Sequence, residues 1–88
     1  MASKITYKTT VIKDLRRIDK QEARRIINKL EKVLSENPDA GVALTGEFQG
    51  LFRYRAGDYR VIYSKSPGQV LVLRIAHRKE VYRTVPPS

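Results

Sequence analysis

The stretch LFRYRAGDYRVIY, from Leu51 to Tyr63, places three arginines within an alternating pattern of polar and apolar residues. Successive side chains of a β-strand point to opposite faces, so Arg53 and Arg55 are expected on the face opposite the intervening aromatic residues. The pattern therefore predicts a strand with one aromatic face and one basic face.

A two-residue turn at Gly57-Asp58 would complete a β-hairpin and set its register. Arg55 would then pair directly with Arg60, and both side chains would point the same way. Like charges directly opposite each other destabilise a sheet, whereas guanidinium groups suit the binding of phosphate oxygens. An edge strand protected by positive charge is the simpler interpretation, but three arginines exceed that need. The hairpin therefore predicts an anion site.

The tyrosines of the hairpin, Tyr54, Tyr59 and Tyr63, have the parity of the other face. We expect them to face the helices as core or half-core residues rather than to stack on bases. No chemistry is assigned to them.

The chain has 88 residues, a length typical of one small domain, and we expect residues 1–88 to form a single unit. Cysteine is absent and there is one histidine, which argues against disulfides, thiolate metal sites and metal chemistry. The N-terminus lacks the apolar stretch of a signal peptide, and no run approaches membrane-spanning length. We therefore expect a cytoplasmic protein that needs no cofactor and binds no membrane.

Eighteen Lys and Arg residues oppose nine Asp and Glu residues, which gives a formal net charge of +9. The excess indicates an anionic partner, but composition alone does not choose among nucleic acid, an anionic membrane surface and an acidic protein. From residue 53 to residue 83 there are eight basic residues against two acidic ones. We therefore expect the C-terminal half to bind the partner.

Apolar residues at helical spacing predict two helices before the hairpin. The first contains Val11, Leu15 and Ile18, and the second has a longer stripe formed by Ala23, Ile26, Ile27, Leu30, Val33 and Leu34. Asp19 and Glu22 have the spacing of a capping box at the start of the second helix, and Asn37-Pro38 ends it. The two helices should therefore form a helical hairpin.

Four strands are expected, over residues 4–8, 51–56, 59–64 and 69–76. Short turns join the last three, which should form an antiparallel meander. Residues 38–50 predict an irregular connection, and the segment HRKEVYRTVPPS has room only for a turn or a brief helix. The fold class is therefore α+β, with two helices packed on a small, mainly antiparallel sheet.

The helices carry further basic residues that lie mostly off the apolar stripe, namely Lys13, Arg16, Arg17, Lys20, Arg24, Arg25, Lys29 and Lys32. A solvated helix face is the simpler interpretation. The alternative is a surface that contacts phosphates and adds affinity without chemistry.

His77 and Tyr82 are the other side chains near the basic residues that suit proton transfer. His77 is either an ordinary hydrogen-bonded imidazole or a base kept neutral by the like charges of Arg74, Arg78 and Lys79. Tyr82 either anchors the tail on the sheet or contacts a nucleobase or a phosphate.

The chain resembles the RelE-type toxins of the RelE/ParE superfamily of type II toxin–antitoxin systems over nearly its whole length. The motifs that carry the resemblance are Leu44 with Gly46, the hairpin FRYRAGDYRVIY and the terminal segment HRKEVY. The first two motifs are shared widely across the superfamily. HRKEVY is similar to the branch that cleaves RNA rather than to the branch that poisons gyrase.

The resemblance implies an α+β fold like that of small microbial ribonucleases. It also implies a metal-independent endoribonuclease that cuts mRNA in the ribosomal A site. In this chemistry the ribose 2′-hydroxyl attacks the adjacent phosphate. The enzyme must orient that hydroxyl, stabilise charge on the phosphorane and protonate the 5′ leaving oxygen.

The resemblance assigns catalytic roles by position to Arg53, Arg55, Arg60, His77, Arg78 and Tyr82. Arg60 matches the family's phosphate-binding arginine and Tyr82 its terminal tyrosine, while His77 or Arg78 takes the remaining basic position. Well-studied members carry lysines where this chain has Arg53 and Arg55. Because an arginine hardly deprotonates in a protein, we expect these two to stabilise charge and His77 or Tyr82 to transfer protons. Glu47 is a further candidate base.

A cognate RelB-like antitoxin is also implied, an acidic or amphipathic segment that folds on the toxin and covers its basic surface. Contacts with DNA would then be made by the antitoxin and not by this chain. Two other functions stay open. One is a gyrase-directed toxin on the same fold, and the other is a non-catalytic module that binds RNA or ribosomes.

Overall fold

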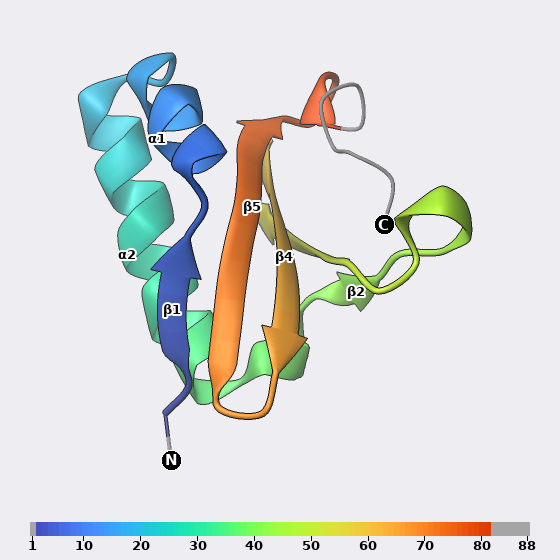
Figure 1. The fold of residues 1–88 in the computed structure, drawn as a ribbon. Helices are drawn as coiled ribbons and strands as arrows, with labels where there is room; N and C mark the ends of the chain where they lie inside the picture. Colours follow the sequence, from blue (N-terminus) through green and yellow to red (C-terminus); the bar gives the residue numbers. More distant parts are fainter. Residues whose placement is uncertain (1, 82–88) are drawn as a thin grey trace.

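Residues 2–81 carry two helices and a five-stranded sheet in the computed structural model (Figure 1). The elements are, in chain order, β1 (Lys4–Tyr7), α1 (Thr9–Arg16), α2 (Lys20–Glu36), the 3₁₀ turn η1 (Pro38–Ala40), β2 (Val42–Ala43), the 3₁₀ turn η2 (Gly46–Phe48), β3 (Phe52–Ala56), β4 (Tyr59–Ser66) and β5 (Gln69–His77). The predicted order of the two helices and four strands is confirmed, with small changes at the ends of the strands, and β2 is an additional strand.

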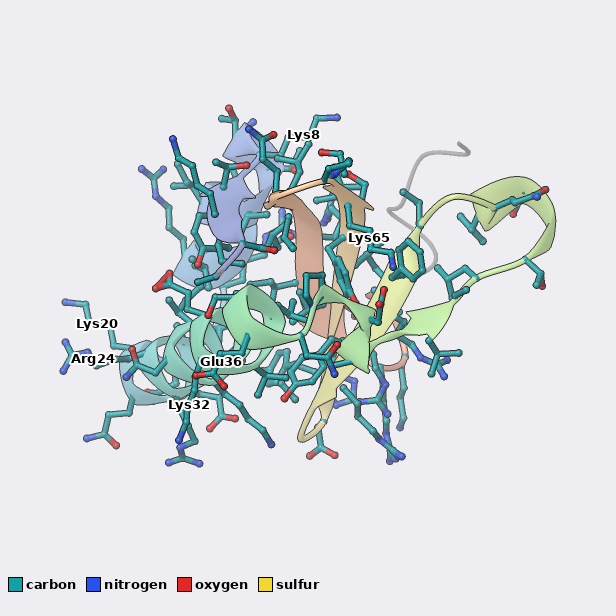
Figure 2. The ribbon with its side chains drawn as sticks, turned by 90° about the horizontal axis from the view of Figure 1, so that it is seen from below. Lys8, Lys20, Arg24, Lys32, Glu36 and Lys65 are labelled. Carbon is teal, nitrogen blue, oxygen red and sulfur yellow. The ribbon has the colours of Figure 1, made fainter. Side chains whose placement is uncertain are left out.

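The sheet has the strand order β1-β5-β4-β3-β2. β1 pairs with β5 in parallel, and every other pairing is antiparallel. Figures 1 and 2 show both helices on one side of the sheet, and β2 is the edge strand at the opposite end of the sheet from β1. The α+β class and the antiparallel meander are therefore confirmed. The face away from the helices is called the arginine face below.

Local signals set the limits of α2 as predicted. The carboxylate of Asp19 accepts a hydrogen bond from the backbone N–H of Gln21 at 3.1 Å, and the helix ends before Asn37. Its apolar stripe buries Ile26, Leu30 and Leu34 against the sheet, while its basic residues are exposed on the outer side (Figure 2). Within residues 2–81, neither helix is long and apolar enough to cross a membrane.

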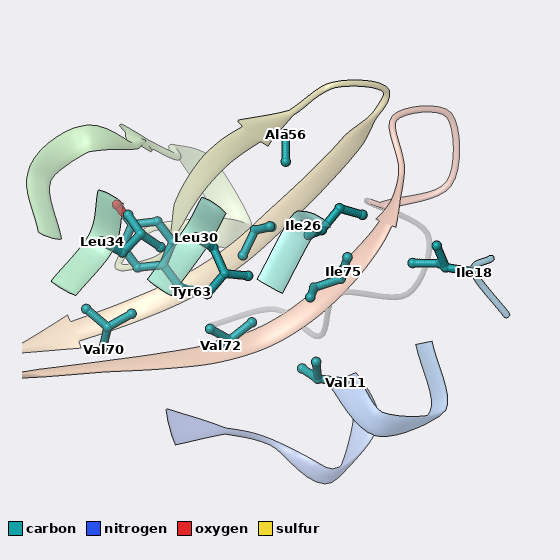
Figure 3. Close-up of a cluster of buried hydrophobic side chains, with 11 residues drawn as sticks. Val11, Ile18, Ile26, Leu30, Leu34, Ala56, Tyr63, Val70, Val72 and Ile75 are labelled. Carbon is teal, nitrogen blue, oxygen red and sulfur yellow. The ribbon is translucent and has the colours of Figure 1, made fainter. Parts of the chain in front are cut away.

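The main core lies between the helices and the sheet, and Tyr63 is its largest fully buried side chain (Figure 3). Its hydroxyl donates to the carbonyl of Pro38 at 2.7 Å and accepts from the N–H of Gly41 at 3.1 Å. These bonds satisfy a polar atom in an apolar site and tie η1 to the sheet. Tyr54 and Tyr59 are half-buried against the same core, so the predicted parity of the hairpin tyrosines is confirmed.

Helix α1 covers the part of β5 that β1 does not reach. Beyond Val72, where the pairing with β1 ends, the hydroxyl of Thr10 donates to the carbonyl of Leu73 at 2.8 Å. The buried carboxylate of Asp14 accepts from the N–H of Ile75 at 3.0 Å and from Arg74 at 2.7 Å. Side chains of a helix thus supply the hydrogen bonds that another strand would make.

A smaller apolar cluster lies on the arginine face, where Leu51, Ile62 and Val81 are buried. Leu44 and Phe48, from the segment around η2, pack against it. Strand β2, which pairs with β3 just before this segment, was not predicted from the sequence. Two residues are too few to carry an alternating pattern, so nothing local distinguishes this strand from a loop.

The substitution Gly41→Ala should destabilise the fold. A Cβ at this position would lie 2.5 Å from the hydroxyl of Tyr63 and 2.8 Å from the carbonyl oxygen of Arg53. The backbone oxygen cannot move without disturbing β3, so we expect a loss of about 1–3 kcal/mol in the free energy of unfolding. Urea denaturation measures this loss. The neighbouring exchange Ala40→Gly, at an exposed site, serves as control, and an unchanged midpoint for Gly41→Ala would contradict the expectation.

Candidate functional site

The β3–β4 hairpin has the register that its sequence predicts. Its turn is Gly57-Asp58, with Ala56 opposite Tyr59 and Arg55 opposite Arg60. Gly57 has a φ of 62°, and none of the described residues other than glycine has a positive φ. A positive φ at the first turn residue alone is typical of a type II′ turn, whose twist suits a hairpin.

Four guanidinium groups form the arginine site at the turn end of the arginine face: Arg53, Arg55, Arg60 and Arg78. Burial lowers the pKa of Arg60, and the positive charges of Arg55, Arg53 and Arg78 lower it further. The carboxylate of Asp58 raises the pKa of Arg60 and so acts against this effect. Arg53, Arg55 and Arg78 therefore lie close enough to Arg60 to repel its charge.

Arg60 is only 8% exposed, and the backbone of the turn holds its side chain. Its Nη1 donates to the carbonyl of Gly57 at 2.9 Å and to the carbonyl of Tyr59 at 3.1 Å. The N–H of Arg78 donates to the carbonyl of Asp58 at 2.9 Å. No sequence signal marks these acceptors, because a carbonyl oxygen is present at every residue.

His77 lies on the other side of the sheet from the arginine site. It pairs with Tyr59, and the two rings meet edge to face with centroids 5.8 Å apart. Both line a cavity of about 140 Å³ at the end of α1, together with Asp14. The imidazole Nδ1 accepts from the N–H of Lys79 at 3.3 Å. The structure thus brings Arg78, and not His77, to Arg60.

An irregularity in β5 explains the position of His77. Ile62 pairs with Arg74 and Tyr63 pairs with Val72, so Leu73 has no partner in the register. Strict alternation from Val72 would put His77 on the arginine face, but one extra residue reverses the parity. No local signal in the sequence identifies this bulge.

Tyr82 lies outside the described residues, and its role stays a prediction. Glu47 belongs to the exposed 3₁₀ turn η2. No group of three or more His, Cys, Asp and Glu side chains that could hold a metal ion occurs in the part of the chain that the structure describes.

The arginine site suits an anion with several oxygens. Guanidinium groups bind phosphate through paired N–H donors, and four of them can share the charge of one phosphate or of two neighbouring phosphates. Because Arg60 is already held by carbonyl groups, little side-chain freedom is lost when it binds. The arrangement can therefore stabilise negative charge that develops at a phosphate.

Removing one of the repelling charges should stabilise the free protein. Arg55 is exposed and directly opposite Arg60, so we expect Arg55→Ala to raise the free energy of unfolding by a few tenths to about 1 kcal/mol at low salt. The gain should shrink as salt screens the charges. Denaturation at two salt concentrations measures it. Arg24→Ala, at an exposed site on α2, is the control, and a loss of stability for Arg55→Ala would refute the repulsion.

Comparison with known proteins identifies the family and the fold of the chain. Residues 5–82 match the family described as ParE toxin of type II toxin–antitoxin system, parDE. The chain is 32% identical over 85 residues to Toxin RelE of Mycobacterium tuberculosis, and the match covers 93% of this chain and 88% of that protein.

Two solved structures have the same fold. The toxin–antitoxin complex RelBE2 from Mycobacterium tuberculosis contains a chain with a TM-score of 0.84 and 27% identity, covering 89% of this chain and 93% of that one. The archaeal RelE–RelB complex from Pyrococcus horikoshii OT3 contains a chain with a TM-score of 0.69 and 28% identity. That match covers 89% of this chain and 97% of the other. The predicted RelE-like α+β fold is therefore confirmed. The chain belongs to the RelE/ParE superfamily of type II toxin–antitoxin toxins.

Proposed function

We propose that this toxin is a metal-independent endoribonuclease that cuts mRNA in the ribosomal A site. The observation that carries the proposal is the arginine site, where Arg53, Arg55 and Arg78 surround the partly buried Arg60. Such a concentration of cations costs stability in the free protein, so it requires a functional reason. A phosphate that gains negative charge during reaction supplies that reason.

The proposed reaction is an internal transfer at phosphorus. The ribose 2′-oxygen loses its proton and bonds to the adjacent phosphorus, the bond from phosphorus to the 5′-oxygen breaks, and that oxygen takes up a proton. The products are a 2′,3′-cyclic phosphate and a free 5′-hydroxyl. Arg60 binds the phosphate and the other arginines share the charge of the phosphorane, while proton transfer falls to another group.

Proton transfer is assigned to Tyr82, which the family resemblance matches to the terminal tyrosine. Arg53 and Arg55 are poor bases and act on charge. His77 is withdrawn from this role because it packs against Tyr59 on the side of the sheet away from the arginine site. The sequence left the remaining basic position to either His77 or Arg78, and we assign it to Arg78.

The proposed partners follow from the relatives. The relative of 32% identity is named as a RelE toxin, and the two solved structures are complexes of RelE with RelB. A RelB-like antitoxin that covers the arginine site would neutralise the toxin, and a net charge of +9 favours an acidic segment as partner. Any contact with DNA would come through the antitoxin. Action on ribosomes would place the protein in the cytoplasm, with residues 1–88 acting as one domain.

A gyrase-directed toxin is the second candidate. It is favoured by the family description, which names ParE for residues 5–82. The arginine site gives no reason for such an activity, because binding to a protein does not require guanidinium groups gathered around a buried arginine. The nuclease therefore remains the better supported function.

Primer extension on a defined message, held on ribosomes with an empty A site, tests the nuclease. We expect the wild-type protein to cut at the A-site codon and Arg60→Ala to lower the rate by about a hundredfold or more, since one stabiliser of the charged transition state is lost. Arg24→Ala removes the same charge from the exposed face of α2 and should keep the rate at saturation. Intact message in every lane, with or without ribosomes, would rule out the nuclease and turn attention to gyrase.

The variant His77→Gln tests the assignment of proton transfer. We expect its cleavage rate at saturation to stay within about twofold of the wild type, because the imidazole lies away from the arginine site. Tyr82→Phe, measured in the same assay, should lose most of the rate. A large loss for His77→Gln, with normal stability, would return the histidine to the mechanism.

A further inference from the structure

The two-residue turn between β3 and β4 holds two members of the arginine site through its backbone. Its carbonyl at Gly57, together with that of Tyr59, accepts from Nη1 of Arg60. The carbonyl at Asp58 accepts from the N–H of Arg78. Two cationic residues that are 18 positions apart in the sequence are thus fixed relative to the same turn.

These bonds oppose the repulsion within the arginine site. Arg60 is the most buried of the four arginines and faces the positive charges of Arg55, Arg53 and Arg78. A long side chain under such repulsion would swing toward solvent if nothing held it. Two carbonyl oxygens on one nitrogen offset part of the repulsion and restrict the guanidinium to one position.

The position of the Gly57 carbonyl depends on the conformation of the turn. Gly57 has a φ of 62°, which an L side chain adopts only with strain, although an added Cβ would meet nothing within 4 Å. A side chain at this residue would therefore act through the backbone and not through a clash. Its effect would be to rotate the peptide group of Gly57, whose carbonyl accepts from Arg60.

We propose that the Gly57-Asp58 turn is a positioning element of the nuclease, with Gly57 as a positioning residue that keeps the Arg60 guanidinium aimed at the scissile phosphate. This inference rests on the proposed function and deepens it. Gly57 touches no substrate. It affects the rate by fixing the Arg60 guanidinium, which does touch the substrate. A small displacement of this charge-stabilising group would lower the stabilisation of the transition state.

The other hairpin offers a matched control. Gly68, in the turn between β4 and β5, has a φ of 76° and also has open space where a Cβ would lie. It is at the opposite end of β4, and its turn makes no bond to the arginine site among the described residues. Gly57→Ala and Gly68→Ala both place a side chain at a positive φ, but only the first change lies in the turn that holds Arg60.

The test is a double-mutant cycle in single-turnover cleavage of message on ribosomes, with enzyme at saturation. We expect Gly57→Ala to lower the rate roughly tenfold to a hundredfold, and Gly68→Ala to stay within about twofold. In the Arg60→Ala background, Gly57→Ala should cost less than about twofold, because the group that it positions is gone.

The outcomes separate this inference from the proposed function. If Arg60→Ala keeps the wild-type rate, the proposed site itself fails. If Arg60→Ala lowers the rate but Gly57→Ala does not, only the positioning role is overturned. The same holds if Gly57→Ala lowers the rate by the same factor in the wild-type and Arg60→Ala backgrounds. An independent readout is the NMR signal of the Arg60 guanidinium, assigned by its loss in Arg60→Ala. It should shift in Gly57→Ala and not in Gly68→Ala, and the reverse pattern would refute the proposal.

Discussion

The register of the β3–β4 hairpin is the constraint on which both faces of the sheet depend. The turn at Gly57-Asp58 pairs Arg55 with Arg60 on one face and, by the same alternation, directs Tyr59 and Tyr63 into the core on the other. A slip of one residue would send the arginines into the core and the aromatic rings to the opposite face. Burial of the aromatic face therefore fixes the position of the charges.

This dependence explains how the fold tolerates charges that repel. Fully buried side chains on the helix side, among them Leu30 and Tyr63, supply the apolar burial that stabilises the sheet. The buried Asp14 of α1 accepts from the N–H of Ile75, next to the residue of β5 that pairs with Arg60, so helix α1 rather than the arginine face completes the hydrogen bonds of this part of β5. The fold can then carry the repelling charges of the arginine site, at some cost in stability.

Much of the fold could be predicted because its signals are local. The capping carboxylate of Asp19, the apolar stripe of α2 and the glycine turn each act within a few residues, and all three predictions are confirmed. Strand β2 is too short to have a pattern. The covering of β5 by α1 depends on where β1 ends, which involves residues about sixty positions apart.

The sequence by itself determined the element order, the basic face of the hairpin and the net charge, because alternation, turn chemistry and composition are properties of neighbouring residues. Only the tertiary structure decided which basic residues share the site. One extra residue in β5 turns His77 toward Tyr59, while the backbone of the turn holds Arg78 near Arg60. A bulge and a carbonyl acceptor are set by the pairing of distant strands, so no local pattern encodes them.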